Sequence, residues 1–387
     1  MSDGRRRRRA KQARRDTRRK AACQRDPLGA QKRDEESSVD TTFRDGVRRA
    51  LRRHPVGLLS IASVMLNVAR PDLLVSPESD ADYLDRILTS LIDRRNRETT
   101  ALLAVIAELL GDDPEPQLRC RREVAERGEH LPRWIGTLSR VEAYRAVRRA
   151  HVFGDVDELV IGMRLDGGHE LTIAVGIDHN LFSTVVGAGV VEGTIDMALA
   201  RVAETSTDTS VFEMTLNDAR AWIGEALDKP RLVPKTETWP LYRPLVQWLV
   251  SRLPEGGEPR SPAWLESAER LCDTFFAGEA AAPFTDSGHR EMLLQLLESG
   301  TGDPLRWSAT RVERTIGRTL YLEGSIPLEV VLDAPDLLRA FVPFAHAQSG
   351  IRDELTSRTL AAIDALRTDY KRKVLREANY WWLDEAV

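Results

Sequence analysis

Cysteine is scarce in this chain of 387 residues, and its few copies are far apart. The three cysteines, Cys23, Cys120 and Cys272, are odd in number and separated by about a hundred residues or more. This spacing indicates neither a disulfide framework nor metal ligation by a C-x-x-C motif. We therefore expect a protein of the reducing cytoplasm, with no metal site and no cofactor.

Long apolar runs are also missing. The longest, Val56 to Ala69, spans 14 residues and includes Ser60, Ser63 and Asn67. A helix needs about 20 apolar residues to cross a bilayer. No apolar segment follows the arginines near the N-terminus, so neither a secretory nor a twin-arginine signal is complete. We expect no membrane span.

Lysine is rare, and the basic charge is distributed unevenly. Only seven of the 56 basic residues are lysines, a bias that is as typical of a GC-rich genome as of selection for guanidinium groups. Residues 1–33 hold 14 basic residues and three aspartates, which gives +11, whereas the net charge of the whole chain is -4. A cationic tail on an acidic body predicts a polyanionic partner, or a tail that folds back on its own body.

The first 38 residues show no apolar pattern, and we expect them to form a disordered, Arg-rich tail. A basic amphipathic helix should follow between Phe43 and His54. Apolar residues recur there at helical spacing, and Arg44, Arg48 and Arg52 repeat every four residues.

Mobile cations are sufficient to neutralise phosphates, so the tail and this helix predict contact with DNA or RNA without base readout. No aromatic residue lies among the arginines before Phe43, and base stacking is therefore not indicated. The expected phosphate-binding residues are Arg5, Arg6, Arg7, Arg8, Arg9, Lys11, Arg14, Arg15, Arg18, Arg19, Lys20, Arg44, Arg48 and Arg52.

Apolar stripes at helical spacing predict a helical domain over residues 39–150. Pro55 should restart the chain as a more buried helix over Val56 to Ala69. The domain is expected to end in a basic helix from Ser139 to Ala150.

The apolar period then changes to two, which predicts a β-hairpin around the turn Asp166-Gly167-Gly168. A three-residue loop pairs Leu165 with His169, whereas a two-residue loop would place apolar residues opposite polar ones. The same register sets Arg164 opposite Glu170 on the solvated face.

The remaining elements complete a mainly helical α+β fold. Residues 151–228 should form a small α+β domain with the hairpin in an antiparallel sheet, followed by a linker at 229–240 and a helical domain over 241–387. Helices are expected at 194–204 and 215–227, the second capped by Thr215, and at 242–252, 262–276, 287–299, 308–321, 335–347 and 351–384.

A glycine pattern, Gly187-x-Gly189-x-x-x-Gly193 before a helix, is superficially similar to a dinucleotide-binding motif. Two features count against such a motif. Glu192 occupies the place where it needs a small residue, and the chain after Glu213 has a helical pattern where a dinucleotide-binding fold would supply further parallel strands. A strand with a glycine kink or bulge is the favoured interpretation.

Acid and base chemistry would have to come from the ends of the hairpin. His169 and His179 lie ten residues apart, about 33 Å along a straight strand, so they cannot share one ion. The register places His179 opposite Asp155, which allows a His–Asp pair at the strand end. The candidate acid/base groups are Asp155, Asp178 and His179, although such pairs are more often structural.

The segments Gly167-Gly-His-Glu-Leu-Thr172 and Ile177-Asp-His-Asn-Leu181, with Glu237-Thr-Trp-Pro240, resemble a family of uncharacterised actinobacterial proteins. The resemblance covers most of residues 130–375 and implies no activity.

Together these observations predict a cytoplasmic protein that is non-enzymatic and contacts nucleic-acid phosphates nonspecifically through its basic tail. Two alternatives stay open. One is an enzyme with its site near the central hairpin, and the other is an interaction scaffold that binds an acidic protein partner.

Overall fold

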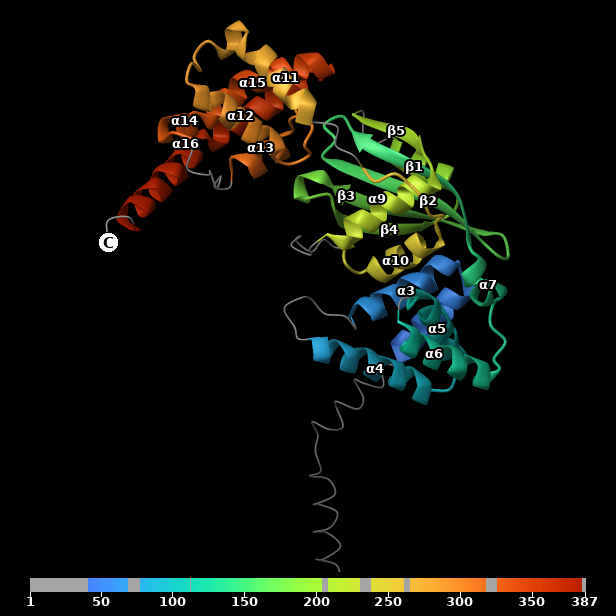
Figure 1. The fold of residues 1–387 in the computed structure, drawn as a ribbon. Coiled ribbons are helices and arrows are strands. Elements are labelled where there is room, and N and C mark those ends of the chain that lie inside the picture. The colour runs from blue at the N-terminus through green and yellow to red at the C-terminus, as the bar shows by residue number, and fades with distance from the viewer. Residues whose placement is uncertain are drawn as a thin grey trace, which may run out of the picture. The chain divides into compact units, whose positions relative to one another are not determined.

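The computed structural model divides into two compact units, residues 1–53 and 54–387. Figure 1 shows the helices and strands, coloured by residue number along the chain. The residues that the structure describes are 41–68, 77–111, 113–203, 208–229, 238–260, 265–317 and 326–384. The tail predicted over residues 1–38 lies outside them.

The described part of the first unit contains a helix over residues 41–52, as its apolar spacing predicts. Arg44, Arg48 and Arg52 are all exposed on it, and so are Arg49 and Arg53 at its C-terminal end. The spacing of four residues puts the first three on one face. Arg48 lies 3.5 Å from the carboxylate of Asp45, one turn earlier.

The second unit begins with a group of helices. They are α3 (Pro55–Val68), α4 (Pro77–Asp93), α5 (Arg97–Leu109), α6 (Pro114–Arg127) and the short α7 (Arg133–Gly136). Pro55 starts α3 where proline is tolerated, at the first helical position. Helix α5 is the most buried, and Asn96 caps its N-terminus by accepting a hydrogen bond from the Thr99 amide.

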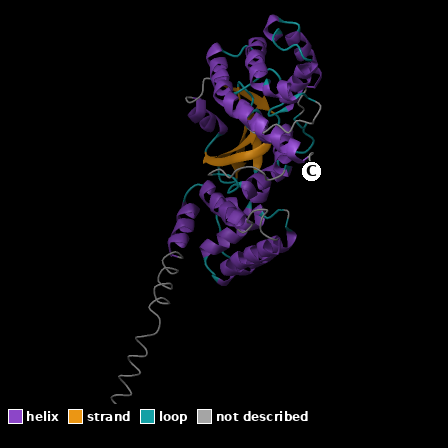
Figure 2. Ribbon diagram, turned by 90° about the vertical axis from the view of Figure 1, so that its left-hand side faces the viewer, coloured by secondary structure: helices purple, strands orange, loops and turns teal. Residues whose placement is uncertain are grey.

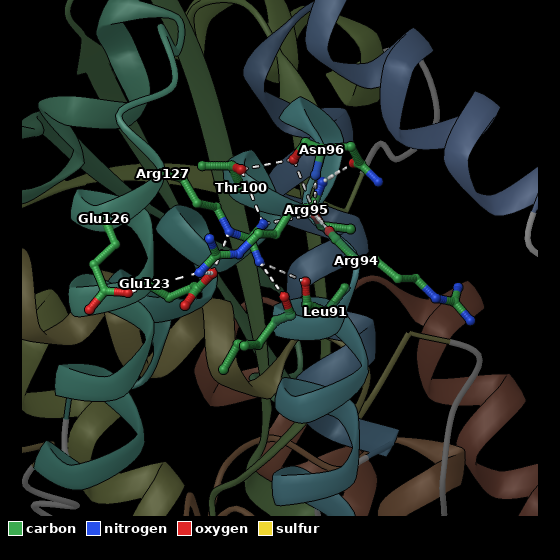
Figure 3. A network of polar contacts seen from close by, with 10 residues as sticks. Leu91, Arg94, Arg95, Asn96, Thr100, Glu123, Glu126 and Arg127 are labelled. Atoms are coloured by element: carbon green, nitrogen blue, oxygen red, sulfur yellow. Dashed lines mark hydrogen bonds and ion pairs between the residues drawn. The ribbon is translucent and has the colours of Figure 1, made fainter.

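Arg127, at the end of α6, joins three of these helices (Figure 3). Its side chain is 3% exposed and pairs with Glu123 at 2.8 Å. It also donates to the carbonyls of Leu91 and Ile92, which end α4, and to Thr100 at the start of α5. These carbonyls would otherwise lack partners, so the cation acts as a C-terminal cap for α4.

Among the described residues, a single antiparallel sheet of five strands follows, in the order β4-β3-β2-β1-β5. Figure 2 shows the strands in orange, with helices in purple around them. The strands are β1 (Glu142–His151), β2 (Val156–Leu165), β3 (His169–Asp178), β4 (Thr184–Glu192) and β5 (Thr209–Met214). The hairpin register is confirmed. Leu165 pairs with His169, and Arg164 with Glu170, across the three-residue loop.

Strand β1 corrects one prediction. Residues 142–151 form a strand between β2 and β5 rather than the end of a basic helix over 139–150. Ala146 and Val147 are buried on opposite faces, while Arg148 and Arg149 continue the alternation. Arginine stems can cover an apolar surface while their charged ends reach partners. Arginines can therefore occupy half-buried strand positions, and the alternation of apolar and polar residues that indicates a strand is then not evident in the sequence.

Helices cover both faces of the sheet. Helix α8 (Ile195–Ala203) packs on the face of Val147 and Val160. Helix α9 (Leu216–Asp228) lies against β1, β3 and β4 on the other face, where Trp222 stacks on Arg148. Thr215 caps α9 through the Asp218 amide, as the sequence predicts.

The C-terminal region is helical. It contains α10 (Arg243–Arg252), α11 (Leu265–Phe276), α12 (Ser287–Glu298), α13 (Ala309–Thr315), α14 (Leu328–Leu332), α15 (Ala334–Ser349) and α16 (Asp353–Asp384). A core that includes Phe275, Trp307, Phe341 and Tyr370 joins α11 to α16. Helix α14 and the 3₁₀ turn η3 (Glu279–Ala281) were not expected from the sequence, and neither was α6.

The fold is therefore mainly helical α+β, with a small antiparallel sheet in mid-chain and helices before and after it. Among the described residues, no helix is both long enough and apolar enough to span a membrane. The predicted boundaries at 150, 228 and 240 stay predictions, although β1 belongs with the sheet that follows it.

Candidate functional site

The end of the central hairpin carries a buried cluster of polar side chains. Strand β3 ends at Asp178, and the 3₁₀ turn η2 (His179–Leu181) follows. Phe182 and Ser183 then reverse the chain in the left-handed region, with φ of 58° and 55°. Strand β4 begins at the next residue. This tight return brings the side chains of η2 back over the start of β2.

His179 is the centre of the cluster. It is 2% exposed, and both of its ring nitrogens have partners. Its Nε2 lies 3.0 Å from Oδ2 of Asp157, and its Nδ1 lies 3.0 Å from Oγ of Ser183. The ring therefore connects a buried carboxylate on β2 with the hydroxyl of a half-buried serine before β4.

The partner of His179 differs from the expected one. The register is as predicted, because the His179 amide donates to the carbonyl of Asp155 over 2.8 Å. The imidazole, however, pairs with Asp157, two residues further along β2. His179 has left the strand for a 3₁₀ turn, and its side chain reaches the diagonal neighbour instead of the opposite one. The carboxylate of Asp155 accepts from Nδ2 of Asn180 at 2.8 Å.

Asp178, the third predicted acid/base residue, is held in an ion pair. Both of its oxygens accept from Arg314 of α13, at 3.1 Å and 2.9 Å. It also caps η2 by accepting from the Asn180 amide. Such a bidentate pair is a geometry typical of a structural connection. The structure thus brings Asp155, Asp178 and His179 together, with different partners for each.

Next to this cluster, α13 contributes a fully buried arginine. Arg311 stacks on Trp307 at 4.0 Å and donates to the carbonyls of Leu297 and Arg306, both at 2.9 Å. Burial lowers the pKa of Arg311 to about 10, because desolvation penalises the charged form. This arginine holds the loop between α12 and α13 in place and leaves Arg314 directed at Asp178.

The other polar residues singled out by the sequence lie elsewhere. His169 begins β3 at the end opposite His179. No group of three or more metal-ligating side chains occurs among the described residues. Cys120 and Cys272 are buried, and burial raises the pKa of their thiols to about 11 and about 12. Thiols in such surroundings are inert.

The glycine pattern does not form a dinucleotide site. Gly187 and Gly189 lie within β4 of an antiparallel sheet, and not in the strand-to-helix turn where such a motif would hold a pyrophosphate. The register shifts at this point, so that Gly176 pairs with Gly187 but Ile177 pairs with Val185, which confirms the predicted bulge. These glycines line a cavity of about 450 Å³ beside α8, with the ion pair of Arg149 and Glu158 at one edge.

Of the predicted phosphate-binding residues, Arg44, Arg48 and Arg52 lie on the exposed helix over 41–52. The others, Arg5 to Lys20, lie outside the described residues.

Comparisons with protein-family models, with curated proteins and with solved structures found no match to this chain. The resemblance to an actinobacterial family therefore stays a prediction, and function has to be inferred from the residues themselves.

Proposed function

We propose that this protein contacts nucleic-acid phosphates through its N-terminal basic segment, without reading base sequence. The observation that carries the proposal is the exposed row of Arg44, Arg48 and Arg52 on the helix over 41–52, which continues the arginine-rich sequence before it. The helix supplies exposed cations, and the sequence before it supplies many more. This composition suits a charged backbone better than a base edge.

The uneven distribution of charge supports this arrangement. Residues 1–33 carry +11, although the whole chain carries -4, so the rest of the protein is acidic. An acidic body repels the nucleic acid and leaves only the N-terminal segment for contact. Because such contact releases condensed counterions, binding should weaken steeply as salt rises. A cytoplasmic location is part of this proposal.

The test is a titration of the full-length protein with a labelled DNA duplex and a labelled single-stranded RNA between 50 and 200 mM salt. If 6 to 10 phosphates are engaged, affinity should fall about 10³ to 10⁵-fold over this range. Replacement of Arg44, Arg48 and Arg52 by glutamine should lower the salt slope by about 3, because each phosphate contact contributes about 0.9. Replacement of Arg5 to Arg9 should lower it further.

A matched control removes three exposed arginines from helix α16. The variant with Arg358, Arg372 and Arg376 changed to glutamine has the same net charge as the first triple variant. It should bind with an unchanged salt slope. Equal losses in the two variants would show that only net charge matters and would contradict the proposal. Binding to an acidic protein but to neither nucleic acid would favour the scaffold function instead.

A further inference from the structure

The turn before β4 places a serine in an unusual backbone conformation beside a buried histidine. Phe182 and Ser183 both have positive φ, at 58° and 55°, and neither is a glycine. A bulky residue in this region is uncommon and costs free energy. Two in succession require the surrounding structure to hold them there, and such positions are concentrated at functional sites.

The hydrogen bonds determine which groups donate. The carboxylate of Asp157 can only accept, so Nε2 of His179 carries a proton and donates to it over 3.0 Å. In the neutral ring, Nδ1 is then an acceptor, and the hydroxyl of Ser183 donates to it over 3.0 Å. A serine whose proton already faces a histidine acceptor has the arrangement of an activated nucleophile.

Asp157, His179 and Ser183 form a hydrogen-bonded relay, and burial fixes this relay in place. The side chains of His179 and Asp157 are 1% and 4% exposed. Arg148 lies 3.7 Å from Asp157 on the side of the strand next to β1 and supplies a countercharge. Ser183 is less buried than either partner, so the buried end of the relay is the carboxylate and its accessible end is the hydroxyl.

We propose that Ser183 is the nucleophile of a second, hydrolytic site, with His179 as its general base and Asp157 as the residue that positions the imidazole. The substrate class is a carboxylic ester with an apolar acyl group, because the neighbouring Phe182 is 78% exposed and offers an apolar surface next to the hydroxyl. The site is independent of the basic segment.

The chemistry proceeds in two balanced steps. Oγ of Ser183 attacks the ester carbonyl carbon while its proton passes to Nδ1 of His179. The C–O bond to the alcohol breaks, and the alcohol leaves with that proton. Water then attacks the acyl-serine with His179 again as the base, which releases the acid and restores the hydroxyl. Compared with the serine-protease triad, the two ring nitrogens exchange roles, but one still accepts and the other still donates.

An activated serine reacts with fluorophosphonates, which gives a test that needs no known substrate. The full-length protein is incubated with an alkyl fluorophosphonate, and the modified residue is identified by peptide mass spectrometry. Hydrolysis of p-nitrophenyl butyrate is followed in parallel. One label per chain is expected, on Ser183, and Ser183→Ala should lose both the label and the ester hydrolysis.

Two further variants separate a catalytic from a structural role. Asp157→Asn should lower the maximal labelling rate at least tenfold without changing the probe concentration at half-maximal rate, since Asp157 does not touch the probe. Ser349→Ala is the matched control, because its hydroxyl bonds only to backbone carbonyls, and it should label normally. The proposal is overturned if the folded parent takes up no label, or if Ser183→Ala is labelled as fast as the parent.

Discussion

His346 lies in a buried network where protonation would be costly. It is 1% exposed, and its Nε2 accepts from the Trp307 amide at 3.2 Å, while Nδ1 lies 2.9 Å from Oγ1 of Thr356. Burial lowers its pKa to about 4, because desolvation disfavours the imidazolium, and the Trp307 carbonyl, which lies 3.1 Å from Nε2 and can accept from the protonated ring, opposes this only in part. The folded protein therefore holds this histidine neutral.

The depressed pKa predicts a loss of stability in mild acid. The unfolded chain takes up a proton at His346 below about pH 6.5, whereas the folded protein does so only near pH 4. The contribution of the neutral His346 ring to the free energy of unfolding is complete above pH 6.5 and is lost as pH falls toward 4. Relative to His346→Gln, the parent should lose about 2 kcal/mol between pH 7.5 and pH 5. Urea denaturation at both pH values measures this, and a pH-independent difference would contradict it.

Only part of the hairpin cluster could be predicted at the scale of single residues. Alternation and loop length place His179 at a strand end next to Asp155, and the Asp155 carbonyl does accept its amide. The side-chain partners could not be derived in this way. Asp157 becomes the partner because a 3₁₀ turn redirects the imidazole, and Ser183 because two residues adopt positive φ. Neither feature leaves a glycine or proline signal in the sequence.

At the scale of elements, Tyr144 of β1 connects the sheet to helix α8 across a glycine. A Cβ at Gly162 would lie 2.6 Å from Cζ of the tyrosine ring. The tyrosine hydroxyl in turn accepts the amide of Ile195, the first residue of α8, at 3.2 Å. The ring therefore needs the space that Gly162 leaves.

Gly162→Ala should displace this ring and break the hydrogen bond to α8, at a cost of about 1 kcal/mol or more. Chemical denaturation measures the stability, and hydrogen exchange at the Ile195 amide should become faster. Gly189→Ala is the control, because its Cβ would meet nothing within 4 Å. That variant should be neutral or slightly stabilised. Similar losses in both variants would count against a specific role for Tyr144.

Some strands of the sheet could be predicted from the sequence and others could not. The hairpin β2–β3 has strict alternation and a turn whose length fixes the register, and the structure confirms its predicted pairing. At β1 the sequence predicts a helix instead, because alanine and arginine favour helices. Its arginines have partners that come only with the tertiary fold: Arg145 bonds Asp196 and Glu213, and Arg149 bonds Glu158. Such tertiary pairs outweigh the local helix propensity of β1, and a single sequence does not show which residues will form them.

At the scale of the whole second unit, ion pairs connect the sheet to the C-terminal helices. Arg314 of α13 holds Asp178 at the end of β3, and Arg352 bonds Asp208 just before β5. The side chain of Asp178 is 10% exposed, so the first pair is largely shielded from water. Breaking it leaves a shielded carboxylate without its cation.

Arg314→Met should destabilise the protein by about 1 to 3 kcal/mol. Hydrogen exchange should increase in α13 and in η2 together, because the pair connects them. Arg306→Met is the control, since its side chain is 45% exposed and lies 3.7 Å from Asp303. It should change stability by less than about 0.5 kcal/mol. If exchange rises only in α13, the ion pair does not couple the two regions.

The strand order β4-β3-β2-β1-β5 also predicts an order of events during folding. Strands β1 to β4 are joined by short connections, whereas β5 reaches β1 from roughly sixty residues away. Closing that loop costs chain entropy before any ladder bond forms. The sheet should therefore nucleate at the β2–β3 hairpin and add β5 last. Val211→Ala, in β5, should then accelerate unfolding and leave the refolding rate unchanged, whereas Ile161→Val should slow refolding.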